Sequence, residues 1–248
     1  MSELPKLVQD DPWLEGHTDF IRGRMKRFRE TLDWIEDTDG GLRGHARIHL
    51  EQGIHRDGAG NWVVREWLPG ASSVSLIGGF NNWDRTAHPM KKDAQGVWEL
   101  KVPEQELQHG QEIKLHVSGA DGSERDRIPS CIRRTVQDEK SKDFCAQVWQ
   151  PVEGYSWKHD FDPSSISSPL VYEAHVGIAG EEGKVHQYRE FADEVLPRIA
   201  RLGYNTIQLM AVQEHPYYGS FGYHVSNLFA ASSRFGTPED LKHLIDSA

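Results

Sequence analysis

The spacing of apolar residues changes twice along the chain, and each change predicts a different kind of structure. Near the N-terminus, apolar side chains recur every three or four positions among charged residues, which is typical of one face of a helix. They are Phe20, Met25, Phe28, Leu32 and Ile35. The pattern predicts a helix over residues 12–36, ended by Asp39-Gly40-Gly41.

From about residue 45 to 150 the period of the pattern changes to two. Four short stretches alternate apolar and polar positions, and glycine-containing turns separate them. They are residues 62–67, 73–77, 97–102 and 112–117. Several short strands at nearly regular intervals predict an antiparallel β-sandwich, a domain of about 100 residues.

After residue 150 the pattern changes again. Residues 151–168 are rich in Pro, Ser and Asp, which indicates a linker. An apolar strand is expected over 170–176, and a nearly continuous apolar strand over 206–212, the kind that is covered on both faces. Between them a helical stripe runs from Phe191 to Leu202. Pro197 lies inside this stripe and predicts a kink or a late start of the helix.

A last helix is predicted from residue 237. Thr237 suits the position before the helix, and Pro238 suits the first helical position. Leu241, Leu244 and Ile245 are expected to form its buried face.

Alternation of strand and helix predicts a parallel sheet. Two such β/α units cannot cover the faces and edges of a sheet, so the C-terminal domain is expected to be incomplete. The predicted organisation is therefore a multidomain one with four parts. They are a helical segment (1–41), a β-sandwich (42–150), a linker (151–168) and an incomplete α/β domain (169–248).

Composition narrows the possible functions. The formal charge of the 248 residues is −10 and no basic cluster is present, so nucleic acid and a membrane surface are not expected as partners. No apolar run reaches the length of a membrane span, and the N-terminus lacks the pattern of a signal peptide. Cys131 and Cys145 are expected to be unpaired thiols of a cytoplasmic protein.

The connection from Gln213 to Gly236 is long for an α/β domain, and loops of this length are usually functional. In a (β/α)₈ barrel it would lie at the face where active sites are built. Its aromatic rings would suit the C–H faces and hydroxyls of sugars, although they could instead only pack the loop. They are Tyr217, Tyr218, Phe221, Tyr223, Phe229 and Phe235.

Two Glu/His pairs at strand ends allow an acid/base interpretation. Glu173 precedes His175, and Glu214 is followed by His215. A glycosidase needs two carboxyl groups placed across the bond that it cuts. Hydrogen bonding that orients the loop is the simpler interpretation, and we favour it.

In the β-rich region, Trp67 and Trp83 fall in predicted turns, where they either pack into the sandwich or bind a ligand. Lys91, Lys92 and Lys114 are most simply solvated. Motifs for phosphate loops, dinucleotides, zinc and nucleophilic serine are absent, so no metal or cofactor is expected.

These residues resemble the α-1,4-glucan branching enzymes, in the eukaryotic-like subgroup of glycoside hydrolase family 13. The resemblance covers nearly the whole chain. It is carried by Asp11-Pro12-Trp13-Leu14, by Arg65-Glu66-Trp67-Leu68-Pro69-Gly70-Ala71, by Gly79-Phe80-Asn81-Asn82-Trp83 and by residues 171–177. The densest and most specific stretch is residues 202–223, which contains Glu214-His215-Pro216-Tyr217-Tyr218.

The resemblance implies a helical segment, an immunoglobulin-like carbohydrate-binding module of family 48, and then the first two β/α units of a truncated (β/α)₈ (TIM) barrel. The family cuts an α-1,4 linkage, holds the chain as a covalent glycosyl-enzyme and transfers it to a 6-hydroxyl in glycogen biosynthesis. The implied partner is an α-1,4-glucan: glycogen, a starch-like polysaccharide or maltooligosaccharides. The protein is expected to be a cytoplasmic monomer without cofactor.

By position, Tyr223 matches a tyrosine that stacks on the sugar before the scissile bond, and Tyr218 and His215 are placed beside it. The module's site is carried over to Trp67, Leu68, Pro69, Trp83 and Lys114, with Asp39 standing where an acidic residue is usual. Gln95-Gly96-Val97 departs from the family pattern.

The family's catalytic Asp and Glu residues have no counterpart in this chain, so the chain alone is expected to be inactive. Two alternatives remain open: a non-catalytic glucan-binding protein, and another family 13 enzyme such as a debranching enzyme. The loop motif at residues 214–218 favours branching over debranching.

Overall fold

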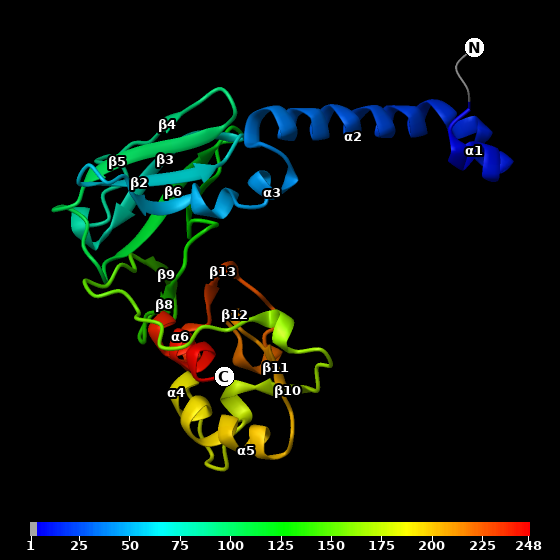
Figure 1. Ribbon diagram of the computed structural model, residues 1–248. Helices are drawn as coiled ribbons and strands as arrows, with labels where there is room; N and C mark the ends of the chain where they lie inside the picture. Colours follow the sequence, from blue (N-terminus) through cyan, green and yellow to red (C-terminus); the bar gives the residue numbers. More distant parts are fainter. Residues whose placement is uncertain (1–3) are drawn as a thin grey trace. The chain divides into compact units, whose positions relative to one another are not determined.

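The computed structural model describes residues 4–248 (Figure 1), and the chain separates into two compact units at Leu50. The N-terminal unit is helical. It contains α1 (Lys6–Asp10), a 3₁₀ helix (Pro12–His17), α2 (Thr18–Asp39), α3 (Leu42–His45) and a second 3₁₀ helix (Ile48–Leu50).

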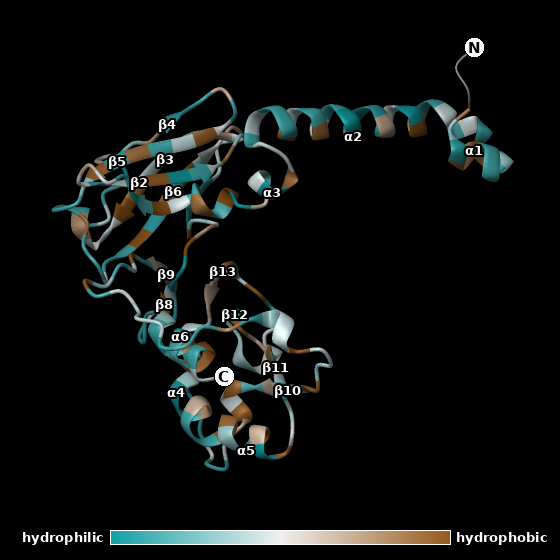
Figure 2. Cartoon of the chain, viewed as in Figure 1, coloured by the Kyte–Doolittle hydropathy of each residue, from teal (hydrophilic) through white to brown (hydrophobic). Residues whose placement is uncertain are grey.

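The predicted N-terminal helix is confirmed, although its first six residues form a 3₁₀ helix. The Asp11 side chain accepts a hydrogen bond from the Trp13 amide at 3.1 Å and so caps this 3₁₀ helix. At the other end Gly40 adopts a left-handed conformation (φ +67°) that favours glycine and ends α2. Figure 2 shows α2 as mainly hydrophilic with separate hydrophobic positions. Of the predicted apolar stripe, Ile35 is buried, whereas Phe20 and Phe28 are exposed.

In the second unit, nine short strands among the described residues form two antiparallel sheets, which confirms the predicted sandwich. One sheet has the order β1-β2-β5-β4, and the other has β3-β6-β9-β8 with β7 paired to β6. Their bounds are β1 (Gly53–Arg56), β2 (Asn61–Trp67), β3 (Ala71–Gly78), β4 (Lys91–Lys92), β5 (Val97–Pro103), β6 (Glu112–Gly119), β7 (Glu124–Arg127), β8 (Thr135–Gln137) and β9 (Phe144–Gln147).

The core of the sandwich lies between the two sheets. Val64 and Leu76 come from facing sheets and have no exposed surface. Burial of each such side chain stabilises the fold by about 1.5–3 kcal/mol. The ring nitrogen of buried Trp62 donates to the Leu107 carbonyl, so the one polar atom of this large side chain is satisfied.

Residues 151–168 contain no strand and one 3₁₀ turn (Pro163–Ser165). They are tied to α6 (Pro238–Ser247) through the carboxylate of Asp246. The Tyr155 hydroxyl donates to it at 2.7 Å, and the amides of Lys158 and His159 donate at 3.1 Å. Residues 155–159 of this segment are therefore attached to α6.

The α/β segment begins with β10 (Val171–His175), which pairs in parallel with β11 (Thr206–Met210). The connection consists of α4 (Tyr188–Glu190), a π-helical turn (Phe191–Val195) and α5 (Leu196–Arg201). Pro197 is the second residue of α5, directly after the π turn, which confirms the predicted late start. Proline supplies no amide for the helical ladder, and a wider turn before it accommodates that loss.

The predicted start of the last helix is also confirmed. The Asp240 amide donates to the Thr237 hydroxyl at 3.2 Å, and the Thr237 amide donates back to the Asp240 carboxylate at 2.9 Å. Before this helix, β12 (Gln213–Glu214) pairs with β13 (Asn227–Ala231) in an antiparallel hairpin that the sequence pattern did not predict.

Two predictions about burial are wrong. Ile245 was expected on the buried face of α6, but it is 54% exposed. The strand at 206–212 was expected to be covered on both faces, but Gln208 is exposed and the other residues of β11 are half-buried. Helices α4 to α6 bury one side of the two-stranded sheet, and in the described chain nothing buries the other side to the same extent.

Candidate functional site

A groove of about 390 Å³ runs along the start of β3 in the sandwich. Residues of the β2–β3 turn and of β6 and β7 line it. They are Trp67, Leu68, Pro69, Gly70, Ala71, Val117, Gly119, Asp121, Ser123, Arg125 and Arg127. Trp67 is 60% exposed, while its ring nitrogen donates to the Gln95 carbonyl at 3.1 Å. An indole that is fixed at one edge and open on its face is suited to stacking against a sugar ring.

The turn that carries Trp67 is rigid. Leu68 donates its amide to the Gly96 carbonyl at 3.0 Å, and its own carbonyl accepts from the Trp98 ring nitrogen at 2.9 Å. Lys92 donates to the Pro69 carbonyl at 2.6 Å. Gly96 has φ +88°, and a Cβ there would lie 2.8 Å from the Cα of Pro69. Only glycine fits at such a short distance from Pro69. The segment 95–97 therefore packs against the turn that lines the groove.

The structure does not bring all the predicted module residues together. Trp67, Leu68 and Pro69 lie beside the first residue of β3, Ala71. Lys114 lies opposite Ile77 near the last residue of β3, and the Trp83 amide donates to the Gly78 carbonyl. Six residues of strand separate the two groups, a distance of about 20 Å. The single predicted site is therefore two places on the sandwich, each with one exposed tryptophan.

Asp39 belongs to the last turn of α2, in the N-terminal unit. One of its carboxylate oxygens lies 2.7 Å from the Nδ1 atom of His45 in α3. This pair links the last turn of α2 to α3.

In the α/β segment, the side chain of Glu214 joins the loop to the sandwich. It is 1% exposed and accepts hydrogen bonds from the Thr135 hydroxyl at 2.7 Å and the Ser233 amide at 2.9 Å. The His215 amide donates to its other oxygen at 3.2 Å. A buried carboxylate with these partners orients the loop and is not accessible to a substrate. The favoured structural interpretation of Glu214 agrees with this geometry.

Arg134, next to Thr135, makes a second connection. It donates to the Gly236 carbonyl at 3.0 Å, and its guanidinium lies 4.6 Å from the centre of the Trp149 ring. The Trp149 ring nitrogen in turn donates to Glu239 of α6 at 2.7 Å. The two ends of the loop 213–236 are thus attached to Thr135 and Arg134, and the start of α6 is attached to Trp149. These contacts join residues about 80 to 100 positions apart in sequence, so a local sequence pattern could not predict them.

His175 and His215, at the ends of β10 and β12, form a buried pair. His175 is 4% exposed and His215 is fully buried, and the Nε2 atom of each lacks a hydrogen-bond partner among the described residues. Burial, and then the nearby His215, lower the pKa of His175 below its ordinary value. Burial therefore disfavours the protonated form of His175.

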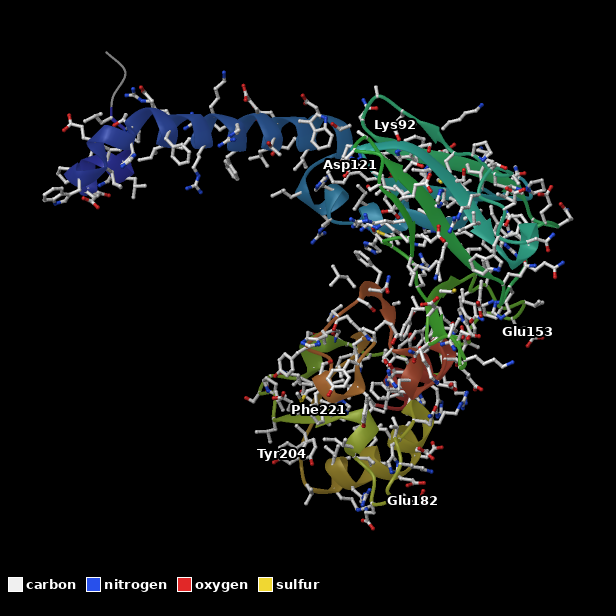
Figure 3. All side chains as sticks on the ribbon, turned by 180° about the vertical axis from the view of Figure 1, so that it is seen from behind. Lys92, Asp121, Glu153, Glu182, Tyr204 and Phe221 are labelled. Atoms are coloured by element: carbon white, nitrogen blue, oxygen red, sulfur yellow. The ribbon has the colours of Figure 1, made fainter. Side chains whose placement is uncertain are left out.

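Aromatic rings surround His175 edge-on. Tyr218, Phe221 and Phe235 have ring centres 6.1, 5.8 and 5.5 Å from it, and Phe221 is labelled in Figure 3. His215 reaches the same cluster through Phe235 at 6.0 Å. The structure thus brings His215 and Tyr218 into one aromatic cluster, while Tyr223 is 80% exposed at the far part of the loop. Glu173 is exposed and lies on β10 opposite Gln208.

Both cysteines are free, as expected. Among residues 4–248 no group of His, Cys, Asp and Glu is arranged to hold a metal ion. In the same part of the chain, no helix combines the length and hydrophobicity needed to cross a membrane.

Comparison with a family model and with solved structures shows which class of domain and fold this chain resembles. Residues 51–132 match the family Carbohydrate-binding module 48 (Isoamylase N-terminal domain). The fold is similar to the Group B Streptococcus pullulanase SAP, solved in complex with maltotetraose (TM-score 0.63, 19% identity, 79% of this chain and 31% of that chain). It is also similar to the pullulanase from Bacillus acidopullulyticus (TM-score 0.58, 18% identity, 79% of this chain and 28% of that chain). Residues 51–132 are therefore similar to a carbohydrate-binding module, and the chain shares its fold with these pullulanases.

Comparison with curated protein sequences shows which enzymes the chain resembles. The chain is 44% identical to the 1,4-alpha-glucan-branching enzyme of Aspergillus oryzae (98% of this chain, 36% of the relative). It is 43% identical to that of Solanum tuberosum (98% and 29%) and 39% identical to that of Equus caballus (99% and 36%). The chain is therefore a relative of the 1,4-alpha-glucan-branching enzymes, and it spans about a third of the length of the curated relatives it matches.

Proposed function

We propose that this chain is the N-terminal region of a 1,4-α-glucan branching enzyme. The observation that carries the proposal is the identity of 39–44% over nearly the whole chain, which includes the α/β segment as well as the sandwich. A relative that shared only the binding module would not match through the loop 213–236. For this reason a non-catalytic glucan-binding protein is the weaker candidate.

The reaction of the complete enzyme would be a glycosyl transfer. An α-1,4 bond breaks, the released 4-hydroxyl takes up a proton, and the glucan segment is held on a carboxylate of the enzyme. A 6-hydroxyl of a glucan then attacks, loses its proton and forms the α-1,6 bond. The catalytic carboxylates would lie outside this chain, which alone would be inactive. Branch formation by the purified 248-residue chain would contradict this.

The proposed organisation assigns a role to each part. Residues 1–41 are the helical segment, 42–150 the α-glucan-binding module, 151–168 the connection, and 169–248 the first two β/α units of a (β/α)₈ barrel. The parallel pair β10–β11 and its helical crossover support the barrel assignment, because this is the repeating unit of that fold. In this frame Tyr223 and Tyr218 would lie at the sugar-binding face, with Tyr223 open to a ligand. His215, which was expected there too, is fully buried and would support the loop without contacting a sugar.

We also propose that the protein is a cytoplasmic monomer. The free thiols of Cys131 and Cys145 support a reducing compartment. A rice relative is named chloroplastic/amyloplastic, so the compartment differs within the family. Equilibrium sedimentation tests the proposed monomer, and a dimer at micromolar concentration would contradict it.

The module's role can be tested by electrophoresis of the chain in native gels that contain glycogen. We expect glycogen to retard the chain, and we expect Trp67→Ala to weaken binding about tenfold or more because the stacking face is lost. Trp157→Ala is the matched control, since Trp157 is 53% exposed but lies outside the groove. Trp83→Ala reports separately on the other end of β3.

Two results would contradict the assignment. One is a chain that glycogen does not retard at any concentration. The other is a Trp67→Ala variant that is retarded as strongly as the Trp157→Ala control.

A further inference from the structure

The groove beside Trp67 contains two arginines that the glucan role does not use. Arg125 and Arg127 lie on β7, an edge strand, and their spacing of two residues places both side chains on one face. Arg125 lies opposite Val117 and Arg127 opposite Leu115, so this face is the one that faces the other sheet. Asp126, between them, faces outward and lies 2.7 Å from the ring of His116.

Both arginine side chains are exposed and line the groove. Within the part of the chain that the structure describes, neither guanidinium donates a hydrogen bond or forms an ion pair. Their charges act at longer range, Arg125 on Asp121 and Arg127 on Glu66. Two guanidinium groups that share a groove and have no partner there are an unusual arrangement in a chain with a formal charge of −10.

The charges around the groove favour an anion. Lys92, which donates to the carbonyls of Pro69 and Ala71, adds a third cation at its rim. Figure 3 labels Lys92 and Asp121 at the same end of the sandwich. Asp121 opposes these cations, but its Oδ1 atom already accepts from the Ser123 amide and hydroxyl at 3.0 and 2.7 Å. Glu66 is buried, accepts from Ser130, and has a pKa raised by burial.

We propose that this groove binds an α-glucan segment that carries a phosphate monoester, with a sugar ring against Trp67 and the phosphate between Arg125 and Arg127. The inference rests on the proposed glucan-binding role of the module and specifies its ligand. A guanidinium presents paired donors that match phosphate oxygens, and charge-assisted bonds of this kind are stronger than neutral ones. The groove volume of about 390 Å³ falls within the range of small-ligand sites.

The same arginines could have a different purpose. Charged side chains that point inward from an edge strand prevent pairing with strands of other molecules. That role needs charge at these positions but no phosphate on the ligand. The two purposes therefore differ in one measurable property, the response of glucan affinity to removal of phosphate.

The experiment compares two ligands on the full 248-residue chain by titration calorimetry. One is a phosphorylated maltodextrin, and the other is the same maltodextrin after phosphatase treatment. We expect the phosphorylated form to bind about tenfold more tightly, and this difference to shrink as salt is raised because the groove is exposed. Arg125→Gln combined with Arg127→Gln should remove this difference, so that the variant binds its two ligands with equal affinity.

Two further variants sharpen the result. Lys140→Gln combined with Arg201→Gln removes the same charge at exposed positions outside the groove, and should keep the tenfold difference. Arg125→Lys combined with Arg127→Lys keeps the charge but loses the planar guanidinium. This variant should keep only part of the tenfold difference in affinity. Inorganic phosphate should compete much less well than the phosphorylated maltodextrin, because it lacks the ring that stacks on Trp67.

The possible results distinguish failure of the phosphate inference from failure of the glucan role. Equal binding of the two maltodextrins, or equal competition by inorganic phosphate, overturns this inference and leaves the glucan role of the module standing. Loss of the difference in the Lys140/Arg201 control also overturns it, because net charge would then be the cause. Binding of neither maltodextrin overturns the glucan role, and the inference with it.

Discussion

The sandwich and the α/β segment cover their sheets in different ways. In the sandwich, two sheets bury each other, and Leu76, Ile113 and Leu115 are at most 1% exposed. In the α/β segment, helices bury one side of a two-stranded sheet, and the residues of β11 stay half-buried or exposed. The sandwich is held by apolar contacts between strands. The loop of the α/β segment is held by a few polar contacts to its neighbour, centred on Glu214.

The largest change in stability is expected from a substitution in the core of the sandwich, between its two sheets. Leu76→Ala should lower the free energy of unfolding by about 2–5 kcal/mol, because it leaves a cavity between the sheets. Urea denaturation followed by tryptophan fluorescence measures it. Leu228→Ala, at a residue that is 69% exposed, is the control and should change stability by less than about 0.5 kcal/mol.

Leu209 of β11 provides the matching test in the other region. It is half-buried, so Leu209→Ala should cost clearly less than Leu76→Ala. An equal loss at the two positions would show that the α/β sheet is as closed as the sandwich and would remove the contrast.

An intermediate effect is expected at the polar contact between the two regions. Thr135→Val keeps the shape of the side chain but leaves the buried carboxylate of Glu214 without one of its donors, which should cost about 1–3 kcal/mol. Thr135→Ser keeps the hydroxyl and should restore most of the loss. A double-mutant cycle with Glu214→Gln should give a coupling of about 0.5–3 kcal/mol. Equal stability of the Val and Ser variants would show that the hydrogen bond contributes nothing.

The smallest effect concerns pH and is confined to the α/β segment. The pKa of His175 is lowered in the folded chain, first by burial and then by His215. Below its ordinary value of 6.5 the unfolded chain therefore binds a proton that the folded chain resists. Stability should fall as pH decreases through this range, and His175→Gln should fall less steeply. Parallel slopes for the two proteins between pH 7 and 5 would contradict the assignment.

The contrast between the regions also explains how much the sequence predicts. Strands β2, β3, β5 and β6 were predictable because each places several residues in the core between glycine-containing turns. Thr237 and Pro197 were predictable because each acts on residues close to it in sequence. The hairpin β12–β13 was not, because β12 has two residues and its pairing shifts register. Ile245 has the spacing of a buried residue, but the described chain leaves 54% of it exposed.

The candidate site divides in the same way. Trp67, Leu68 and Pro69 are adjacent in sequence and stay adjacent in space, so a motif could locate them. Their separation from Trp83 and Lys114 follows from the length of β3, which the motif does not contain. The contact of Thr135 with Glu214 depends on how the sandwich and the α/β segment pack together, and neither residue has a neighbour in sequence that indicates it.

The contacts of β8 have a consequence for protein engineering. Exchanging the sandwich for another one would also exchange these contacts. Here a replacement module would also need a hydroxyl at the position of Thr135 and a guanidinium at that of Arg134, because Glu214 and Gly236 of the receiving domain depend on them. A replacement module without these two groups would bring its own sugar specificity and leave the recipient's loop unsupported.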